Sequence, residues 1–108
     1  MRHVLSVDVE DWFQVGAFES VIDRGDWDLL LPRVEANTDA VLALFAESGV
    51  KATFFTLGWV AARYPRLIRR IVDAGHELAS HGWAHDRVFT MEPATFRADL
   101  ARARATLE

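Results

Sequence analysis

Residues 49–57, Gly49-Val50-Lys51-Ala52-Thr53-Phe54-Phe55-Thr56-Leu57, mark a junction between a helix and a strand. The β-branched and aromatic residues of 51–57 predict the strand. Before it, apolar residues recur at spacings near 3.6, which predicts a helix over about 33–48. Gly49 then suits the position at which a helix ends. The apolar positions of that helix are Val34, Val41, Leu44 and Phe45.

The same arrangement recurs on both sides of this junction. Residues 4–9 and 76–81 read as two further strands. A second helix is expected over about 59–74, with a break or restart at Pro65, and a third begins near Pro93. Strand and helix alternate three times, which predicts parallel strands with right-handed crossovers, as in a doubly wound sheet or a (β/α) barrel.

Three such units cannot close a barrel. A typical eight-unit barrel needs about 250 residues. We therefore expect an α/β fold in which residues 1–108 form the N-terminal portion of a larger domain, cut on its C-terminal side.

Composition narrows the functional classes. The chain of 108 residues is 51% hydrophobic and 26% charged, as in ordinary globular segments. No apolar run reaches the roughly 18 residues of a membrane span, and no signal-peptide core follows the first residues, so we expect a cytoplasmic location. The net charge of -4 provides no basic surface for nucleic acid. Because cysteine is absent, any bound metal must use His, Asp or Glu.

A long irregular stretch covers residues 11–28 and contains Trp12, Phe13, Phe18 and Trp27. It is longer than most strand-to-helix loops, and loops of this kind are often functional. Aromatic residues that pack the loop onto the body of the domain would explain it equally well.

The first candidate site lies at the end of the first strand, in Ser6-Val7-Asp8-Val9-Glu10-Asp11. Alternation along a strand places Asp8 and Glu10 on one face. An unpaired buried carboxylate costs several kcal/mol, and a bound cation would offset that cost for both acids. The alternative is that the strand ends at Val9 and the acids are solvated or cap a turn.

The second candidate site is Ser80-His81-Gly82-Trp83-Ala84-His85, directly after the third strand. Two histidines four residues apart bind one metal when the backbone turns helically. A histidine pair of this spacing is also a common surface feature. The carboxyl ends of parallel strands open on one side, however, so Asp8, Glu10, His81 and His85 should meet there. Two imidazoles and a carboxylate suit a divalent ion, Zn²⁺ above all.

Other polar residues receive structural interpretations. His3 and His76 lie at the opposite ends of their strands from the expected site. Thr56 is expected to pack in the strand. The arginines of the second helix are expected to form a solvated face; they are Arg63, Arg66, Arg69 and Arg70.

These motifs resemble those of the polysaccharide deacetylases that share the NodB homology domain, also called carbohydrate esterase family four. Residues 6–11 resemble the family's first motif, residues 52–55 its second strand, and residues 80–85 its His-x-x-x-His motif. The amino-acid sequences of residues 6–15, 33–38 and 75–85 are similar to those of the subgroup associated with bacterial exopolysaccharide production.

The resemblance implies a distorted (β/α) barrel and hydrolysis of N-acetyl groups on an amino-sugar polysaccharide or oligosaccharide. It implies that Asp8 is the catalytic base and that His81 and His85 are metal ligands. Many members have adjacent aspartates, whereas Val9 follows Asp8 here, so the acidic ligand is Glu10 or Asp11. Strand alternation favours Glu10.

The implied reaction is attack of a metal-activated water on the acetamide, with Asp8 taking the proton. In the family, the leaving amine receives its proton from a histidine of a later motif, and the substrate loop is also later. Neither is present in residues 1–108, so we expect this chain to bind metal better than it catalyses.

Three other functions remain open at this stage. A related C–N hydrolase acting on a small amide would share the metal site. A metal-free carbohydrate-binding or assembly module would keep only the scaffold. A flavodoxin-like regulatory domain would explain the acids of the first strand but not the two histidines.

Overall fold

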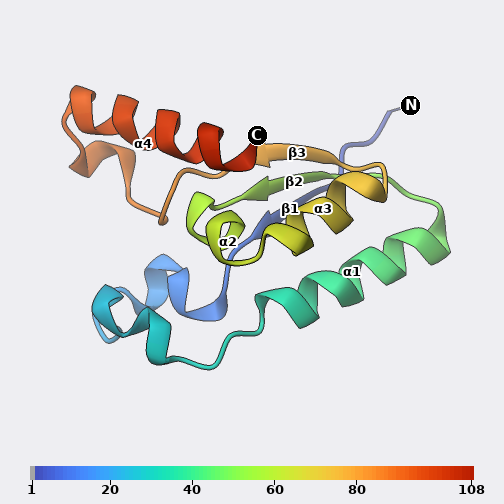
Figure 1. Cartoon of the computed structure of the whole chain (residues 1–108), viewed down its shortest axis with the longest axis horizontal. Coiled ribbons are helices and arrows are strands. Elements are labelled where there is room, and N and C mark those ends of the chain that lie inside the picture. The colour runs from blue at the N-terminus through green and yellow to red at the C-terminus, as the bar shows by residue number, and fades with distance from the viewer. Residues whose placement is uncertain (1) are drawn as a thin grey trace.

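A computed structural model describes residues 2–108 and places three parallel strands at the centre of the molecule (Figure 1). The strands β1 (Ser6–Val9), β2 (Thr53–Thr56) and β3 (Glu77–Ser80) lie side by side in the order β1-β2-β3. Both pairings are parallel, with Ser6 opposite Thr53 and Thr53 opposite Glu77. The predicted parallel direction of the three strands is confirmed, although each strand is shorter than expected.

Four α-helices accompany the strands; they are α1 (Val34–Ser48), α2 (Gly58–Arg63), α3 (Pro65–Asp73) and α4 (Pro93–Leu107). The helix expected over 59–74 is two helices, because Pro65 restarts the backbone after Tyr64 leaves the helical region. Gly49 ends α1 with a left-handed φ of 69°, as its position predicts. None of the helices within residues 2–108 combines the length and apolar character needed to cross a bilayer.

The main core lies between the sheet and the helices. Phe54 and Leu57 contribute from the β2 segment, Val9 from β1, and Leu67 and Ile71 from α3. Each of these five residues is at most 1% exposed. The side chains that alternate with them, among them Ser6, Asp8 and Glu77, are exposed. Alternation therefore gives the sheet one packed face and one face that carries Asp8.

The packed face of α1 agrees in part with the sequence pattern, because Val34, Val41 and Phe45 contact the main core as expected. In α1 the buried residues are Val34, Thr38 and Leu42, each four positions from the next. Leu44 was expected on that stripe but is 57% exposed. Val72 of α3 and Leu100 of α4 are also half-exposed, at 48% and 42%.

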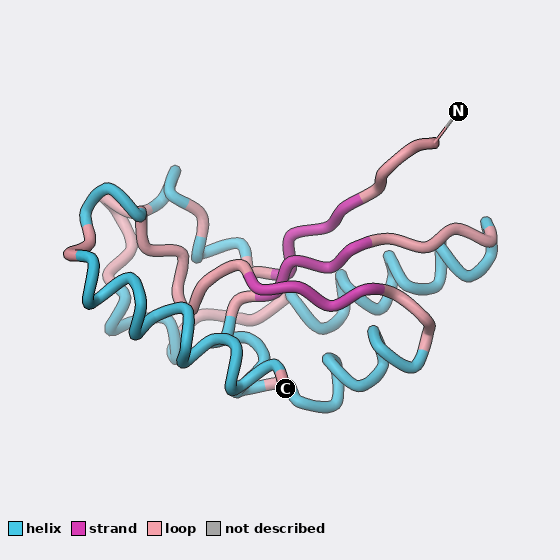
Figure 2. The backbone as a smooth tube through the Cα atoms, turned by 90° about the horizontal axis from the view of Figure 1, so that it is seen from above, coloured by secondary structure: helices cyan, strands magenta, loops and turns pink. Residues whose placement is uncertain are grey.

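Residues 11–31 form a small lobe at the carboxyl end of the strands, on the same side as residues 81–92 (Figures 1 and 2). The lobe is built from three 3₁₀ helices, η1 (Trp12–Gln14), η2 (Gly16–Phe18) and η3 (Arg24–Leu29). A fourth 3₁₀ helix, η4 (Val88–Thr90), lies between β3 and α4 in the chain. Phe13 and Trp27 are buried in a second core with Ala84. Phe13 and Trp27 therefore pack this segment onto the body of the molecule, whereas Trp12 is 39% exposed and Phe18 is 40% exposed.

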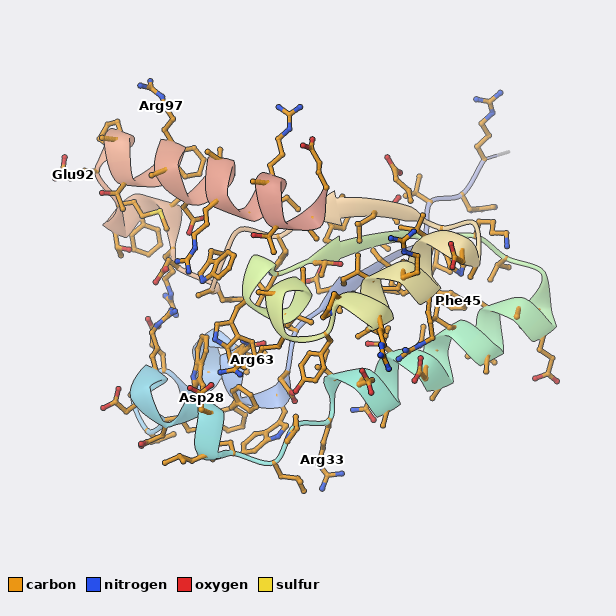
Figure 3. All side chains as sticks on the ribbon, viewed as in Figure 1. Asp28, Arg33, Phe45, Arg63, Glu92 and Arg97 are labelled. Carbon is orange, nitrogen blue, oxygen red and sulfur yellow. The ribbon has the colours of Figure 1, made fainter. Side chains whose placement is uncertain are left out.

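Trp59 of α2 joins the two cores, because it packs against both. Its ring lies 5.9 Å from that of Phe13 and 5.5 Å from that of Trp27, edge to face in both cases. Arg63 lies over the Trp59 ring and pairs with Asp28 of the lobe. Figure 3 shows the Arg63 and Asp28 side chains pointing toward one another. Arg63 therefore links the lobe to α2 while its side chain stays 39% exposed, as expected for a solvated face.

Candidate active site

Three potential metal ligands converge at the carboxyl end of the sheet. One ligand atom from each of Glu10, His81 and His85 lies within 4.8 Å of the others. Glu10 Oε2 is 3.2 Å from His85 Nε2 and 3.6 Å from His81 Nε2. The structure therefore brings together the carboxylate and the two imidazoles that the sequence placed beyond separate strands.

Strand geometry places the acidic residues. Asp8 points to the open face of β1, and Glu10 follows the strand at the same end of the sheet. Asp8 Oδ1 lies 3.9 Å from His81 Nδ1, and its side chain is 55% exposed, whereas that of Glu10 is 16% exposed. Asp8 is thus beside the cluster and open to water, while Glu10 is inside it.

Backbone hydrogen bonds hold the segment that carries both histidines. His81 N–H donates to the Thr56 carbonyl at 3.0 Å, which extends the pairing of β2 with β3. The first N–H groups of α2, at Gly58 and Trp59, donate to the carbonyls of Gly82 and Trp83 at 2.9 Å. The free donors at the start of a helix are thereby satisfied by this segment.

The turn between the histidines uses left-handed backbone conformations. Gly82 has φ 78° and His85 has φ 63°. Glycine adopts this region without strain, whereas a residue with a side chain adopts it at a cost of about 1–3 kcal/mol unless the surroundings impose it. The conformation at His85 turns the chain so that its imidazole meets that of His81, with ring centroids 5.2 Å apart.

Asp11 has a structural role that separates it from Glu10. Its carboxylate accepts hydrogen bonds from the N–H groups of Trp12 at 3.0 Å, Arg33 at 3.1 Å and Val34 at 3.3 Å. Asp11 N–H in turn donates to Gln14 Oε1 at 2.7 Å. Asp11 is therefore fully engaged in capping η1 and the start of α1.

Glu10 Oε2 shows the opposite situation. It is buried and accepts no hydrogen bond from the described residues, although the His85 Nε2 atom lies 3.2 Å away. A buried carboxylate oxygen without a partner is costly, and a cation held jointly with His81 and His85 would satisfy it. The residues present therefore fit a divalent metal ion.

The remaining polar candidates behave as structural residues. His76 is 7% exposed and packs against Phe54 with tilted rings, and its Nδ1 accepts the N–H of Ala52 at 3.1 Å. Burial, followed by the charge of Lys51, lowers the pKa of His76. Thr56 is fully buried in the main core. Neither side chain belongs to the cluster.

A profile of the polysaccharide deacetylase family matches residues 21–108. The chain belongs to this family. A chitooligosaccharide deacetylase of Bradyrhizobium sp. is 39% identical over 66 residues, which cover 61% of this chain and 30% of the relative. A peptidoglycan-N-acetylglucosamine deacetylase of Bacillus cereus is 29% identical over 70 residues, which cover 65% and 26%. The chain spans less than a third of the length of these curated relatives.

Solved structures of polysaccharide deacetylases share the fold. A Mycobacterium smegmatis protein described as a polysaccharide deacetylase superposes with a TM-score of 0.78 at 29% identity, over 97% of this chain and 37% of that one. A family-four pseudoenzyme from Bacillus anthracis gives a TM-score of 0.72 at 22% identity, over 97% and 30%. The predicted fold class is confirmed: the three βα units match the N-terminal part of such structures.

Several residues that shape this deacetylase-family site were not identified from the sequence. Arg24 of the lobe donates to the Ala84 carbonyl at 2.6 Å and pairs with Asp86 at 3.0 Å, which fixes the end of the histidine segment. Asp99 of α4 accepts the N–H of Trp83 at 3.2 Å. No sequence signal marks these contacts, since their partners are 60 and 16 residues away.

Proposed function

We propose that this protein is a metal-dependent hydrolase that removes N-acetyl groups from an amino-sugar polysaccharide or oligosaccharide. The observation that carries the proposal is the convergence of Glu10, His81 and His85 beside Asp8. Relatives named as chitooligosaccharide and peptidoglycan-N-acetylglucosamine deacetylases support the reaction and the class of substrate.

Glu10, His81 and His85 would hold the metal ion, and two imidazoles with one carboxylate favour Zn²⁺. When bound, such an ion polarises a carbonyl group and lowers the pKa of a water molecule. The three side chains leave open positions for both, because the cluster supplies only three ligand atoms. We propose Glu10 rather than Asp11 as the acidic ligand, since the Asp11 carboxylate already accepts backbone hydrogen bonds.

Asp8 is the proposed general base. Its carboxylate is exposed on the open face of β1 and lies next to His81, so it can accept a proton from a water molecule between the strand ends. The leaving amine also needs a proton. His3 and His76 lie at the amino ends of β1 and β3, away from Asp8, so neither can donate it.

We further propose that the reaction belongs to the biosynthesis of a bacterial exopolysaccharide, because the sequences of residues 6–15, 33–38 and 75–85 resemble that subgroup. Two other functions keep the same scaffold: a C–N hydrolase of a small amide, and a carbohydrate-binding module without metal. The similarity to a Bacillus anthracis pseudoenzyme gives a reason to test the second directly.

Metal content tests the proposal. We expect the purified chain to bind about one equivalent of zinc by elemental analysis, and a His81→Ala/His85→Ala variant to bind none. A His3→Ala variant is the matched control, because His3 is exposed and outside the cluster. A folded chain that binds no zinc would instead favour the metal-free module.

A further inference from the structure

Arg24 of the lobe contacts the chain on both sides of His85. Its Nη1 donates to the Ala84 carbonyl at 2.6 Å, and its Nη2 lies 3.0 Å from Asp86 Oδ1. Ala84 precedes His85 in the chain, and Asp86 follows it. One guanidinium group therefore holds both neighbours of a residue that belongs to the cluster of potential metal ligands.

The backbone conformation of His85 needs such support. Its φ of 63° is left-handed, and among residues 2–108 no other residue with a side chain has a positive φ. Residues other than glycine keep this conformation only where surrounding contacts impose it. The Ala84 carbonyl belongs to the peptide group whose direction relative to the His85 side chain is set by that φ. A hydrogen bond that fixes the carbonyl therefore constrains where the imidazole points.

Other elements hold the residues before this point. The backbone groups of residues 81–83 bond to β2, to the first turn of α2 and to Asp99 of α4. These contacts end one residue before the Ala84 carbonyl. The hold on the chain around His85 therefore comes from Arg24, out of the 11–31 lobe.

The lobe in turn fixes Arg24. Its guanidinium carbon lies 4.9 Å from the centre of the Trp27 ring, and Trp27 is buried against Phe13 and Trp59. Asp23, the preceding residue, caps η3 by accepting the N–H of Gly25 at 3.1 Å. A guanidinium also presents its N–H groups as a rigid fork, which suits two acceptors at once.

We propose that Arg24 is a positioning residue, which holds His85 in its left-handed conformation and thereby directs the imidazole toward Glu10 and His81. In this arrangement His85 Nε2 lies 3.2 Å from Glu10 Oε2. The inference rests on the proposed function, because it concerns one of the same metal ligands. Without the guanidinium, His85 should relax to a negative φ and its imidazole should leave the cluster.

A second ion pair between the same two segments provides a matched control. Arg87 Nη2 lies 3.3 Å from Glu19 Oε2, and the two side chains are 50% and 55% exposed. This pair also joins the lobe to the chain after β3, but it involves neither neighbour of His85. Arg87→Met and Arg24→Met therefore remove the same charge and one link to the lobe each, and only Arg24→Met releases the Ala84 carbonyl.

The first measurement needs no metal. In the NMR spectrum of the metal-free chain, a strong NOE between the amide and α protons of His85 marks a positive φ, because these two protons are close in the left-handed conformation. We expect this NOE in the unmodified chain and in Arg87→Met, and we expect its loss in Arg24→Met.

The second measurement is metal binding by the folded proteins. Zinc affinity, from competition with a chelating dye, should fall by about 10–100-fold in Arg24→Met, as for other groups that orient a metal ligand. The visible spectrum of the Co²⁺-loaded protein should change as well, since it reports the ligands around the ion. Arg24→Lys retains the charge but offers one nitrogen in place of two, so its loss of zinc affinity should be smaller. Arg87→Met should match the unmodified chain in both readouts.

A role for Arg24 in joining the lobe to the body alone would give a different result. Arg24→Met would then unfold at lower urea concentration but keep the His85 NOE, the zinc affinity and the Co²⁺ spectrum, and that result would overturn the inference. If Arg24→Met does not fold, unchanged values in Arg24→Lys would overturn it equally. Failure of the unmodified chain to bind zinc would instead contradict the proposed function, and the NOE comparison would still decide whether Arg24 holds His85.

Discussion

Exchanging each of two neighbouring acids for its amide should separate folding from metal binding. In Asp11→Asn, the side chain keeps one oxygen but turns an amide N–H₂ group toward the N–H of Val34. One charge-assisted hydrogen bond is lost and the other two become neutral ones. Hydrogen bonds to charged groups contribute about 1.5–3 kcal/mol and neutral ones about 0.5–1.5 kcal/mol. One lost bond and two weakened bonds together correspond to about 3.5–6 kcal/mol, so we expect the free energy of unfolding to fall by up to about that amount.

Glu10→Gln should weaken zinc binding without lowering the stability of the fold. Glu10 Oε2 is buried and accepts no hydrogen bond from residues 2–108, so its neutral amide should leave the stability of the metal-free chain unchanged or slightly higher. Zinc affinity should fall by about 100-fold or more, since even groups that merely orient a metal ligand are worth about 10–100-fold.

Two measurements distinguish these outcomes. Urea unfolding in the presence of a chelator reports the stability of the metal-free chains, and calorimetric titration with zinc under native conditions reports metal affinity. Asp11→Asn should be less stable but should bind zinc normally while folded. Unchanged stability together with lost zinc affinity in Asp11→Asn would refute the assignment of Glu10 as the acidic ligand.

Three further predictions concern packing, pH and activity. A Cβ at residue 58 would lie 2.4 Å from Trp83 Cε3, so Gly58→Ala should destabilise the chain by about 1–3 kcal/mol and weaken zinc binding. Gly25→Ala is the control, because a Cβ there meets only ordinary contacts, and urea unfolding and zinc titration compare the two variants. Because the pKa of His76 is lowered in the fold, its stabilising contribution is present above pH 6.5 and is lost as the pH falls below that value. Urea unfolding at several pH values should show a weaker acid decline of the unfolding free energy for His76→Asn, which keeps an acceptor for Ala52. An equal decline in both proteins would contradict this. The purified 108-residue chain should show no steady deacetylation of a chitin oligomer by acetate release, because neither His3 nor His76 can protonate the leaving amine, and sustained release would contradict that reasoning.

Local sequence signals were sufficient to predict the order of the elements. Gly49 and Gly75 adopt φ values of 69° and 88° just before the segments that lead into β2 and β3, a conformation that favours glycine for steric reasons. The convergence of Glu10, His81 and His85 followed from topology, because parallel strands end on one side of a sheet. These parts of the fold and the site depend on short-range sterics and chain direction, which a single sequence contains.

Contacts between distant segments were not predictable. Periodicity placed Leu44 on the packed face of α1, whereas the buried stripe includes Thr38, a polar residue that no apolar pattern selects. That an acid after Val9 caps a turn was one of the two possibilities left open, and Asp11 followed by Gln14 three residues later has the spacing of a capping box. Its bonds to Arg33 and Val34 depend on the path of the whole lobe, which the sequence does not reveal.

The left-handed backbone at His85 has a consequence for how quickly a metal ion could be captured. The histidine segment is fixed by Thr56, by the start of α2 and by Arg24, so its unfavourable conformation is imposed when the chain folds. An entering ion then finds a backbone that already directs both imidazoles toward one point. Such preorganisation lowers the entropic cost of chelation.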